Sequence, residues 1–192
     1  MIEDQPRTLA DPAEVSRRRS LLAARHMRPL TLYAASLRRD GVQVPDFDPE
    51  DAGVDAKALF LFEKPGPLAA SSGFISRNND DQTAENTFNF MKDENIPRKK
   101  VAIWNVIPWW DGSISLSAKQ RKEGVAAAFG LVALFPQLRA IMFVGNEAAL
   151  ALPHFRNFHC YRSAHPSNKV RATNRAMWDV IPTAWAQVKT HL

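Results

Sequence analysis

Four short runs of apolar residues, with helical patterns between them, constrain the fold of this chain more than any other feature. The runs span residues 58–62, 101–107, 140–144 and roughly 155–161. Their hydrophobicity is continuous rather than alternating, which indicates strands that are buried on both faces. Strands that alternate with helices in this way predict an α/β fold. We therefore expect a three-layer α/β/α arrangement around a central, mainly four-stranded parallel sheet.

The residues before the first run have a different character. Residues 12–39 are expected to form two helical pieces broken near Pro29, and residues 42–55 hold two prolines and several acids, which is typical of a surface loop. We expect residues 1–55 to be an N-terminal helical extension and loop, packed on an α/β domain of residues 56–192. The whole chain would then form one compact domain.

Two N-cap signals locate helices between the later runs. Asp81 precedes one helix, and Ser117 with Gln120 forms a capping-box pattern at the start of another. The second helix is expected to end before Pro136 and to turn one apolar face inward. That face would hold Val125, Phe129 and Val132.

Composition narrows the class of protein. The chain has 192 residues, a net charge of +5 and a pI near 9.6, which suits an anionic partner such as nucleic acid, although many basic proteins never contact one. The single cysteine, Cys160, permits neither an intrachain disulfide nor a cluster held by several thiolates. The first 30 residues lack a continuous apolar stretch. We expect a cytoplasmic monomer with no membrane anchor, no metal and no cofactor.

Polar residues stand at the ends of three of the expected strands. Residues 63–67 (Glu-Lys-Pro-Gly-Pro) follow the first run, and residues 165–167 (His-Pro-Ser) follow the last. In the second run, Asn105 ends the apolar residues 101–104. Functional residues of an open α/β sheet collect at the carboxyl edge of its strands, so an acid, an amide and an imidazole are expected to share one site. Each motif alone also has a structural explanation, namely a tight turn or a cap.

Two further segments carry residues suited to binding. Phe74 lies in a polar stretch, where its ring could belong to the core or stack on a planar base. The loop after His165 has side chains suited to phosphate contact. These are Ser167, Asn168, Lys169 and Arg171.

The order of these motifs resembles the uracil-DNA glycosylase superfamily, from residue 58 to the C-terminal helix. The chain is most similar to the branch with Gly-Glu-Ala-Pro-Gly in its first motif, here residues 62–66, and Pro-Phe-Val-Gly around a stacking ring, here residues 73–76. Members of that branch hold a four-iron cluster with four cysteines. One cysteine implies a relative without the cluster.

The resemblance implies an enzyme that flips uracil, or another deaminated base, out of DNA and hydrolyses its N-glycosidic bond. It implies that Phe74 stacks on the base, that Asn105 bonds its pairing edge, and that neutral His165 donates a hydrogen bond to the departing base. Glu63 would hold the attacking water. The DNA backbone would be contacted by Lys64, Pro65, Gly66, Pro67, Ser167, Asn168, Lys169 and Arg171.

Lys64 departs from the pattern, because several relatives have Asp or Asn there and a charged lysine cannot accept a proton from water. Either Glu63, residues 80–81 (Asp-Asp) or the backbone would then hold the water.

Gly66 departs too, because the most uracil-selective relatives have a tyrosine that blocks the thymine methyl. The base range is then wider than uracil unless Trp109 or Trp110 fills the gap. A catalytically weak nucleic-acid-binding relative is the alternative. A nucleotide-binding enzyme unrelated to DNA is less favoured, because no Gly-x-Gly-x-x-Gly pattern occurs.

Overall fold

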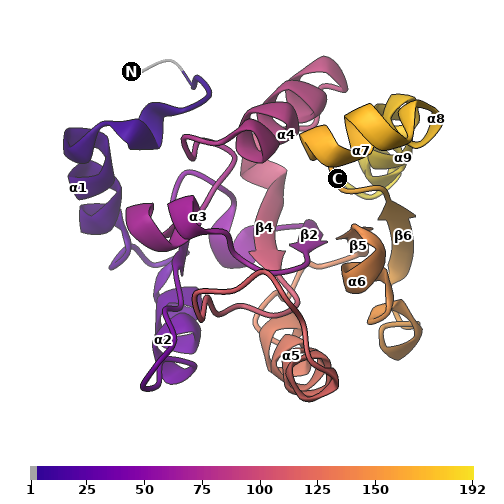
Figure 1. Cartoon of the computed structure of the whole chain (residues 1–192). Helices are drawn as coiled ribbons and strands as arrows, with labels where there is room; N and C mark the ends of the chain where they lie inside the picture. The colour runs from indigo at the N-terminus through magenta and orange to yellow at the C-terminus, as the bar shows by residue number, and fades with distance from the viewer. Residues whose placement is uncertain (1–3) are drawn as a thin grey trace.

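A four-stranded parallel sheet forms the centre of the computed structural model, which describes residues 4–192 (Figure 1). Its strand order is β4-β2-β5-β6. The strands are β2 (Ala58–Phe62), β4 (Val101–Asn105), β5 (Ala140–Val144) and β6 (His159–Ser163). Every residue of β2, β4 and β5 is buried, whereas the edge strand β6 is partly exposed. The α/β class and the central parallel sheet are therefore confirmed.

Helices cover both faces of this sheet. In Figure 1, α4 and α7 to α9 lie on one side, and α2 and α5 lie on the other. Their bounds are α1 (Pro12–Leu21), α2 (Arg28–Ser36), α3 (Pro67–Ser72), α4 (Gln82–Asp93), α5 (Ala118–Val132), α6 (Asn146–Ala149), α7 (Asn168–Thr173), α8 (Arg175–Asp179) and α9 (Ile181–Ala186). The α9 residue Trp185 is fully buried and packs edge-on against Phe60 of β2, with ring centroids 5.2 Å apart. This contact joins the C-terminal helix to the centre of the sheet.

The expected loop at residues 42–55 contains a short strand, β1 (Asp46–Phe47). It pairs in parallel with β3 (Phe74–Ile75), a second strand that the sequence did not predict. Phe47 stacks on Trp104 of β4 with a centroid distance of 3.6 Å. The N-terminal residues are thus attached to the main sheet by an aromatic pair. The boundary at residue 56 stays a prediction.

Both predicted N-caps are present. Asp81 accepts a hydrogen bond from the Ala84 backbone N–H at 2.8 Å, and both bonds of the capping box of Ser117 and Gln120 form. Helix α5 ends at Val132, before Pro136 as expected.

The buried face of α5 differs from the prediction. Its buried residues are Gly124, Ala128 and Leu131, while Phe129 is 47% exposed. Small residues let α5 approach the neighbouring backbone closely. A Cβ added to Gly124 would lie 2.7 Å from the Val106 carbonyl oxygen. Helix α5 therefore lies directly against the loop that follows β4.

The last strand begins later than predicted, at His159 rather than near Phe155. Phe155 is instead buried before the strand, where its ring lies 5.9 Å from that of Phe143. Within residues 4–192, none of the helices has the length and apolar character needed to cross a membrane.

Candidate functional site

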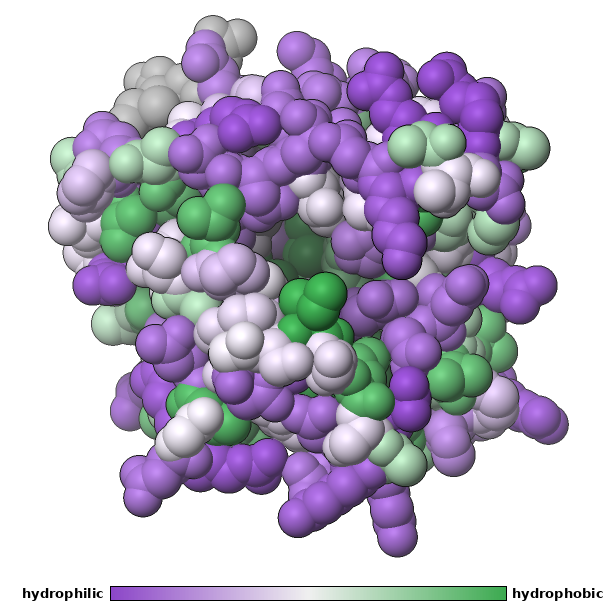
Figure 2. All heavy atoms as spheres, viewed as in Figure 1, coloured by the Kyte–Doolittle hydropathy of each residue, from purple (hydrophilic) through white to green (hydrophobic). Residues whose placement is uncertain are grey.

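A cavity of about 400 Å³ opens where β2 and β4 end, visible as a hollow at the centre of the face in Figure 2. Residues from all three predicted motifs line it. They are Glu63, Lys64, Pro65, Gly66, Pro67, Asn105 and His165. The parallel register explains why they meet, because Phe62 and Asn105 are partners at the ends of adjacent strands. The acid, the amide and the imidazole thus lie around one cavity.

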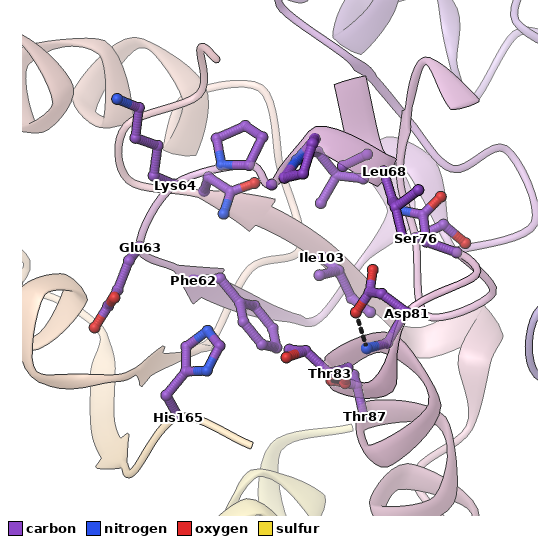
Figure 3. Close-up of a pocket in the computed structure, with 18 of the residues that line it drawn as sticks. Phe62, Glu63, Lys64, Leu68, Ser76, Asp81, Thr83, Thr87, Ile103 and His165 are labelled. Atoms are coloured by element: carbon purple, nitrogen blue, oxygen red, sulfur yellow. Dashed lines mark hydrogen bonds between the residues drawn. The ribbon is translucent and has the colours of Figure 1, made fainter. Parts of the chain in front are cut away.

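Phe74 does not line this cavity. Its side chain is fully buried, and the next residue, Ile75, reaches the cavity instead. Successive side chains of a strand point to opposite sides, so β3 can present only one of the two. The aromatic ring that lines the cavity is Phe62, which packs edge-on against His165 with centroids 5.8 Å apart (Figure 3). The Phe74 ring thus lies outside this cavity, and the stacking role implied for it stays a prediction.

Asn105 ends β4 and is 4% exposed. Its Oδ1 atom is buried and has no hydrogen-bond partner among residues 4–192. Leaving a buried acceptor unpaired costs roughly 1–3 kcal/mol, so such groups are rare and call for an explanation. A ligand that donates a hydrogen bond to this carboxamide would provide one.

His165 follows β6 and lies beside Phe62 in the lining of the cavity (Figure 3). Burial lowers the pKa of His165 to about 4, so the imidazole is neutral near pH 7 and carries one N–H donor. Two hydrogen bonds hold the backbone turn that begins at His165. The Ser167 backbone N–H donates to the His165 carbonyl at 2.8 Å, and the Asn86 side chain of α4 donates to the Pro166 carbonyl at 2.9 Å. No sequence pattern identifies Asn86.

The Glu63 carboxylate points away from Phe62 and His165, as Figure 3 shows. Its Oε1 atom accepts a hydrogen bond from the Glu147 backbone N–H, at the start of α6, at 3.2 Å. Burial raises the pKa of Glu63, and the neighbouring Glu147 carboxylate raises it further. Glu63 therefore borders the cavity while its carboxylate is held at the edge.

Lys64 points out of the cavity in the same view. Its ammonium donates to Asp111 Oδ1 at 2.6 Å, and this bond lowers the pKa of Asp111. The cation thus anchors the loop after β4 and leaves the cavity interior to other groups. Trp109 and Trp110 lie outside the lining, and a Cβ added to Gly66 would meet nothing within 4 Å. The gap beside Gly66 stays open.

The other predicted DNA-contacting residues lie beyond the lining. Ser167 caps α7 by accepting from the Val170 N–H, and Asn168, Lys169 and Arg171 are exposed on that helix. The Arg171 guanidinium lies 5.7 Å from the Trp178 ring centroid. Of the two alternative acids, Asp81 lines the cavity but caps α4, whereas Asp80 pairs with Arg7 at 2.8 Å.

The loop between β3 and α4 contributes a polar wall that the sequence did not identify. Its cavity residues include Ser76, Arg77 and Asn79, all buried. Ser76 donates to Asp48, which also pairs with Arg18 from α1. The N-terminal residues thus support this wall through buried ion pairs. No group of three or more His, Cys, Asp or Glu residues that could hold a metal occurs in the described part of the chain.

No protein-family model matches the chain, and no curated protein matches it. Among solved structures, the chain is similar to the solution NMR structure of a candidate uracil DNA glycosylase from Methanosarcina acetivorans. The sequence identity is 15%, the match covers 77% of this chain and 99% of that chain, and the TM-score is 0.46. The likeness is distant, so the roles of the cavity residues rest on their own geometry.

Proposed function

We propose that this protein is a DNA glycosylase that flips uracil, and other deaminated bases, out of DNA and hydrolyses the N-glycosidic bond. The observation that carries the proposal is the buried Oδ1 of Asn105, which has no hydrogen-bond partner among residues 4–192, in a cavity that also presents neutral His165. A base inside a duplex cannot reach such a cavity, so it must first leave the stack.

Phe62, Asn105 and His165 would bind the flipped base. The Phe62 ring offers the apolar surface in place of Phe74. The Asn105 carboxamide combines one acceptor with two N–H donors, which matches the alternating carbonyl and N–H groups of the uracil edge. Cleavage leaves negative charge on the base, chiefly on its carbonyl oxygen. A neutral His165 would donate to that oxygen, and a preorganised donor of this kind contributes roughly 3–4 kcal/mol in comparable sites.

Glu63 would hold the attacking water at the sugar side. The water oxygen bonds to C1′ as the C1′–N1 bond breaks, the electron pair goes to the base, and the water proton goes to the carboxylate. Glu63 is the candidate because Lys64 is engaged with Asp111 and, while charged, accepts no proton. Its raised pKa favours proton transfer nearer neutral pH than an ordinary glutamate would allow.

The DNA backbone would follow the rim of the cavity. The turn formed by residues 64–67 borders it, and the N-cap and first residues of α7, residues 167–171, follow His165 directly. Lys169 and Arg171, both exposed, add sequence-independent attraction to phosphates.

The alternative, a nucleic-acid-binding relative with weak catalysis, is favoured by one observation. The Glu63 carboxylate is directed at the start of α6 rather than toward His165. Tight binding of uracil-containing DNA without release of the base would support this reading.

Single-turnover assays on single and double strands with one uracil distinguish the two functions. Abasic sites are cleaved with alkali and the fragments are counted. We expect strand breaks with the parent protein, and at least roughly tenfold lower rates for His165→Ala and Asn105→Ala, which corresponds to about 1.4 kcal/mol. Absence of breaks on every uracil substrate, with folded protein, would contradict glycosylase activity. Unchanged rates in both variants would contradict the roles of these residues.

A further inference from the structure

A second cavity of about 280 Å³ adjoins the candidate site and shares Glu63 and Leu116 with it. The Glu63 carboxylate turns toward α6, whose residue Glu147 also lines the second cavity. Apart from Glu63, none of the residues that line the second cavity has a role in the cleavage proposed above. Because the two cavities adjoin, a DNA strand with one base in the first cavity would bring a neighbouring nucleotide near the second.

The walls of the second cavity are mainly apolar. Its apolar residues are Val106, Ile107, Leu116, Val125, Leu150 and Ala151. Leu150 is 60% exposed. Helix α5 can form one wall because Gly124 brings it against the Val106 carbonyl, where a Cβ would lie 2.7 Å away. The position of this wall is therefore fixed by the packing of α5.

Cationic side chains accompany the apolar walls. Arg121 and Lys122 both line the cavity. Arg121 is paired with Glu147 at 2.6 Å, whereas exposed Lys122 forms no ion pair with any residue from 4 to 192. An apolar cavity with a free ammonium beside it suits a ligand that combines a flat apolar ring with a phosphate.

We propose that the second cavity binds the base of the nucleotide adjacent to the flipped one, with Lys122 contacting its phosphate. This inference rests on the proposed glycosylase function. The apolar walls favour contact with the faces of a base, and every base presents such faces. The cavity therefore adds affinity for an unstacked strand without requiring a particular neighbouring sequence.

Oligonucleotides with one uracil and a tetrahydrofuran spacer in place of one neighbouring nucleotide test this role, because the spacer lacks a base and resists alkali. We expect the spacer on one side of the uracil to weaken binding roughly tenfold, because the missing base no longer covers the aliphatic walls, and the spacer on the other side to have little effect. Equal binding of both spacer oligonucleotides and the unmodified one would overturn the proposal.

Variants of α5 provide a matched comparison. Val125→Trp should fill the cavity, so that the spacer and the unmodified oligonucleotides bind with equal affinity. Ala126→Trp, at the exposed neighbouring position, should leave the difference in affinity unchanged. If a folded Val125→Trp protein still binds the spacer oligonucleotide as weakly as the parent protein does, the second cavity does not bind the adjacent base. Lys122→Ala, which removes no buried group, should lower the slope of log affinity against log salt concentration by about one.

The glycosylase function and the role of the second cavity can be tested separately. A parent protein that neither binds nor cleaves any uracil oligonucleotide would overturn the glycosylase function itself. Normal cleavage together with equal binding of all three oligonucleotides, or an unchanged salt slope in Lys122→Ala, would overturn only the role of the second cavity.

Discussion

The carboxylate of Glu63 lies against the backbone of Gly145. Each residue follows the end of one of two adjacent parallel strands, β2 and β5. A Cβ added to Gly145 would lie 2.3 Å from Glu63 Oε1. Gly145 also has φ 96° and ψ 159°, a conformation that is nearly restricted to glycine. The orientation of the candidate catalytic acid therefore depends on a residue without a side chain.

Gly145→Ala should lower both stability and activity. The backbone strain alone costs on the order of 1–3 kcal/mol, and the new methyl group must displace the Glu63 carboxylate. Urea denaturation measures the first effect and single-turnover rates measure the second. The effect on the rate through Glu63 is isolated by making Gly145→Ala in a Glu63→Gln protein as well as in the parent protein. If Glu63 acts through its carboxylate, Gly145→Ala should lower the rate much less in the Glu63→Gln protein.

Asn105→Leu should reduce activity without reducing stability. The change removes a buried acceptor that has no partner in the described structure and replaces it with an apolar group of similar shape, which is neutral or stabilising. The melting temperature should stay the same or rise, while the cleavage rate falls at least roughly tenfold. A clear loss of stability would show that the carboxamide contributes to the fold and would weaken its assignment to ligand binding.

The low pKa of His165 should make stability depend on pH. Between about pH 6.5 and about pH 4 the unfolded chain protonates this histidine while the folded protein does not, so stability falls as the pH falls through this range. The slope from this one group is at most about 1.4 kcal/mol per pH unit. Denaturation of His165→Asn over the same range should show a smaller slope. Equal slopes would contradict the burial of the imidazole.

The main sheet could be predicted because fully buried strands leave continuous apolar runs. β2 and β5 have the predicted bounds. β1 and β3 could not be predicted, since two-residue strands have no measurable periodicity. They exist because their backbones pair across the fold, between residues that are distant in sequence.

The candidate site was predictable at the level of segments but not of side-chain directions. The three motifs meet at one cavity because strand ends meet at one sheet edge. The resemblance implies that Phe74 stacks on the base, but the direction of its ring depends on the pairing of β3, which no local pattern reveals. Likewise, the direction of Glu63 depends on Gly145, at the end of another strand.

Asp48→Asn should destabilise the protein strongly. Asp48 is 1% exposed and pairs with both Arg18 and Arg98, so the change leaves two guanidinium groups without their shared partner. Loss of one member of a buried ion pair typically costs about 3–5 kcal/mol. Thermal unfolding should shift down by roughly 10 °C for a chain of this size. Asp40→Asn, at an exposed position, is the control and should leave the melting temperature unchanged.

Gly66→Tyr should narrow the range of bases removed. Gly66 has an ordinary φ of −92°, and a Cβ there would enter open space beside the cavity, so a larger residue fits without backbone strain. The parent protein should release uracil with a substituent at C5, such as 5-hydroxymethyluracil, because nothing beside Gly66 blocks that position. Gly66→Tyr should keep activity on uracil and lose at least roughly tenfold on the substituted base, a difference of about 1.4 kcal/mol. Gly66→Ala should resemble the parent protein, because one methyl group leaves most of the space open. If the parent protein already rejects the substituted base, another wall of the cavity sets the base range, and the open space beside Gly66 is not its cause.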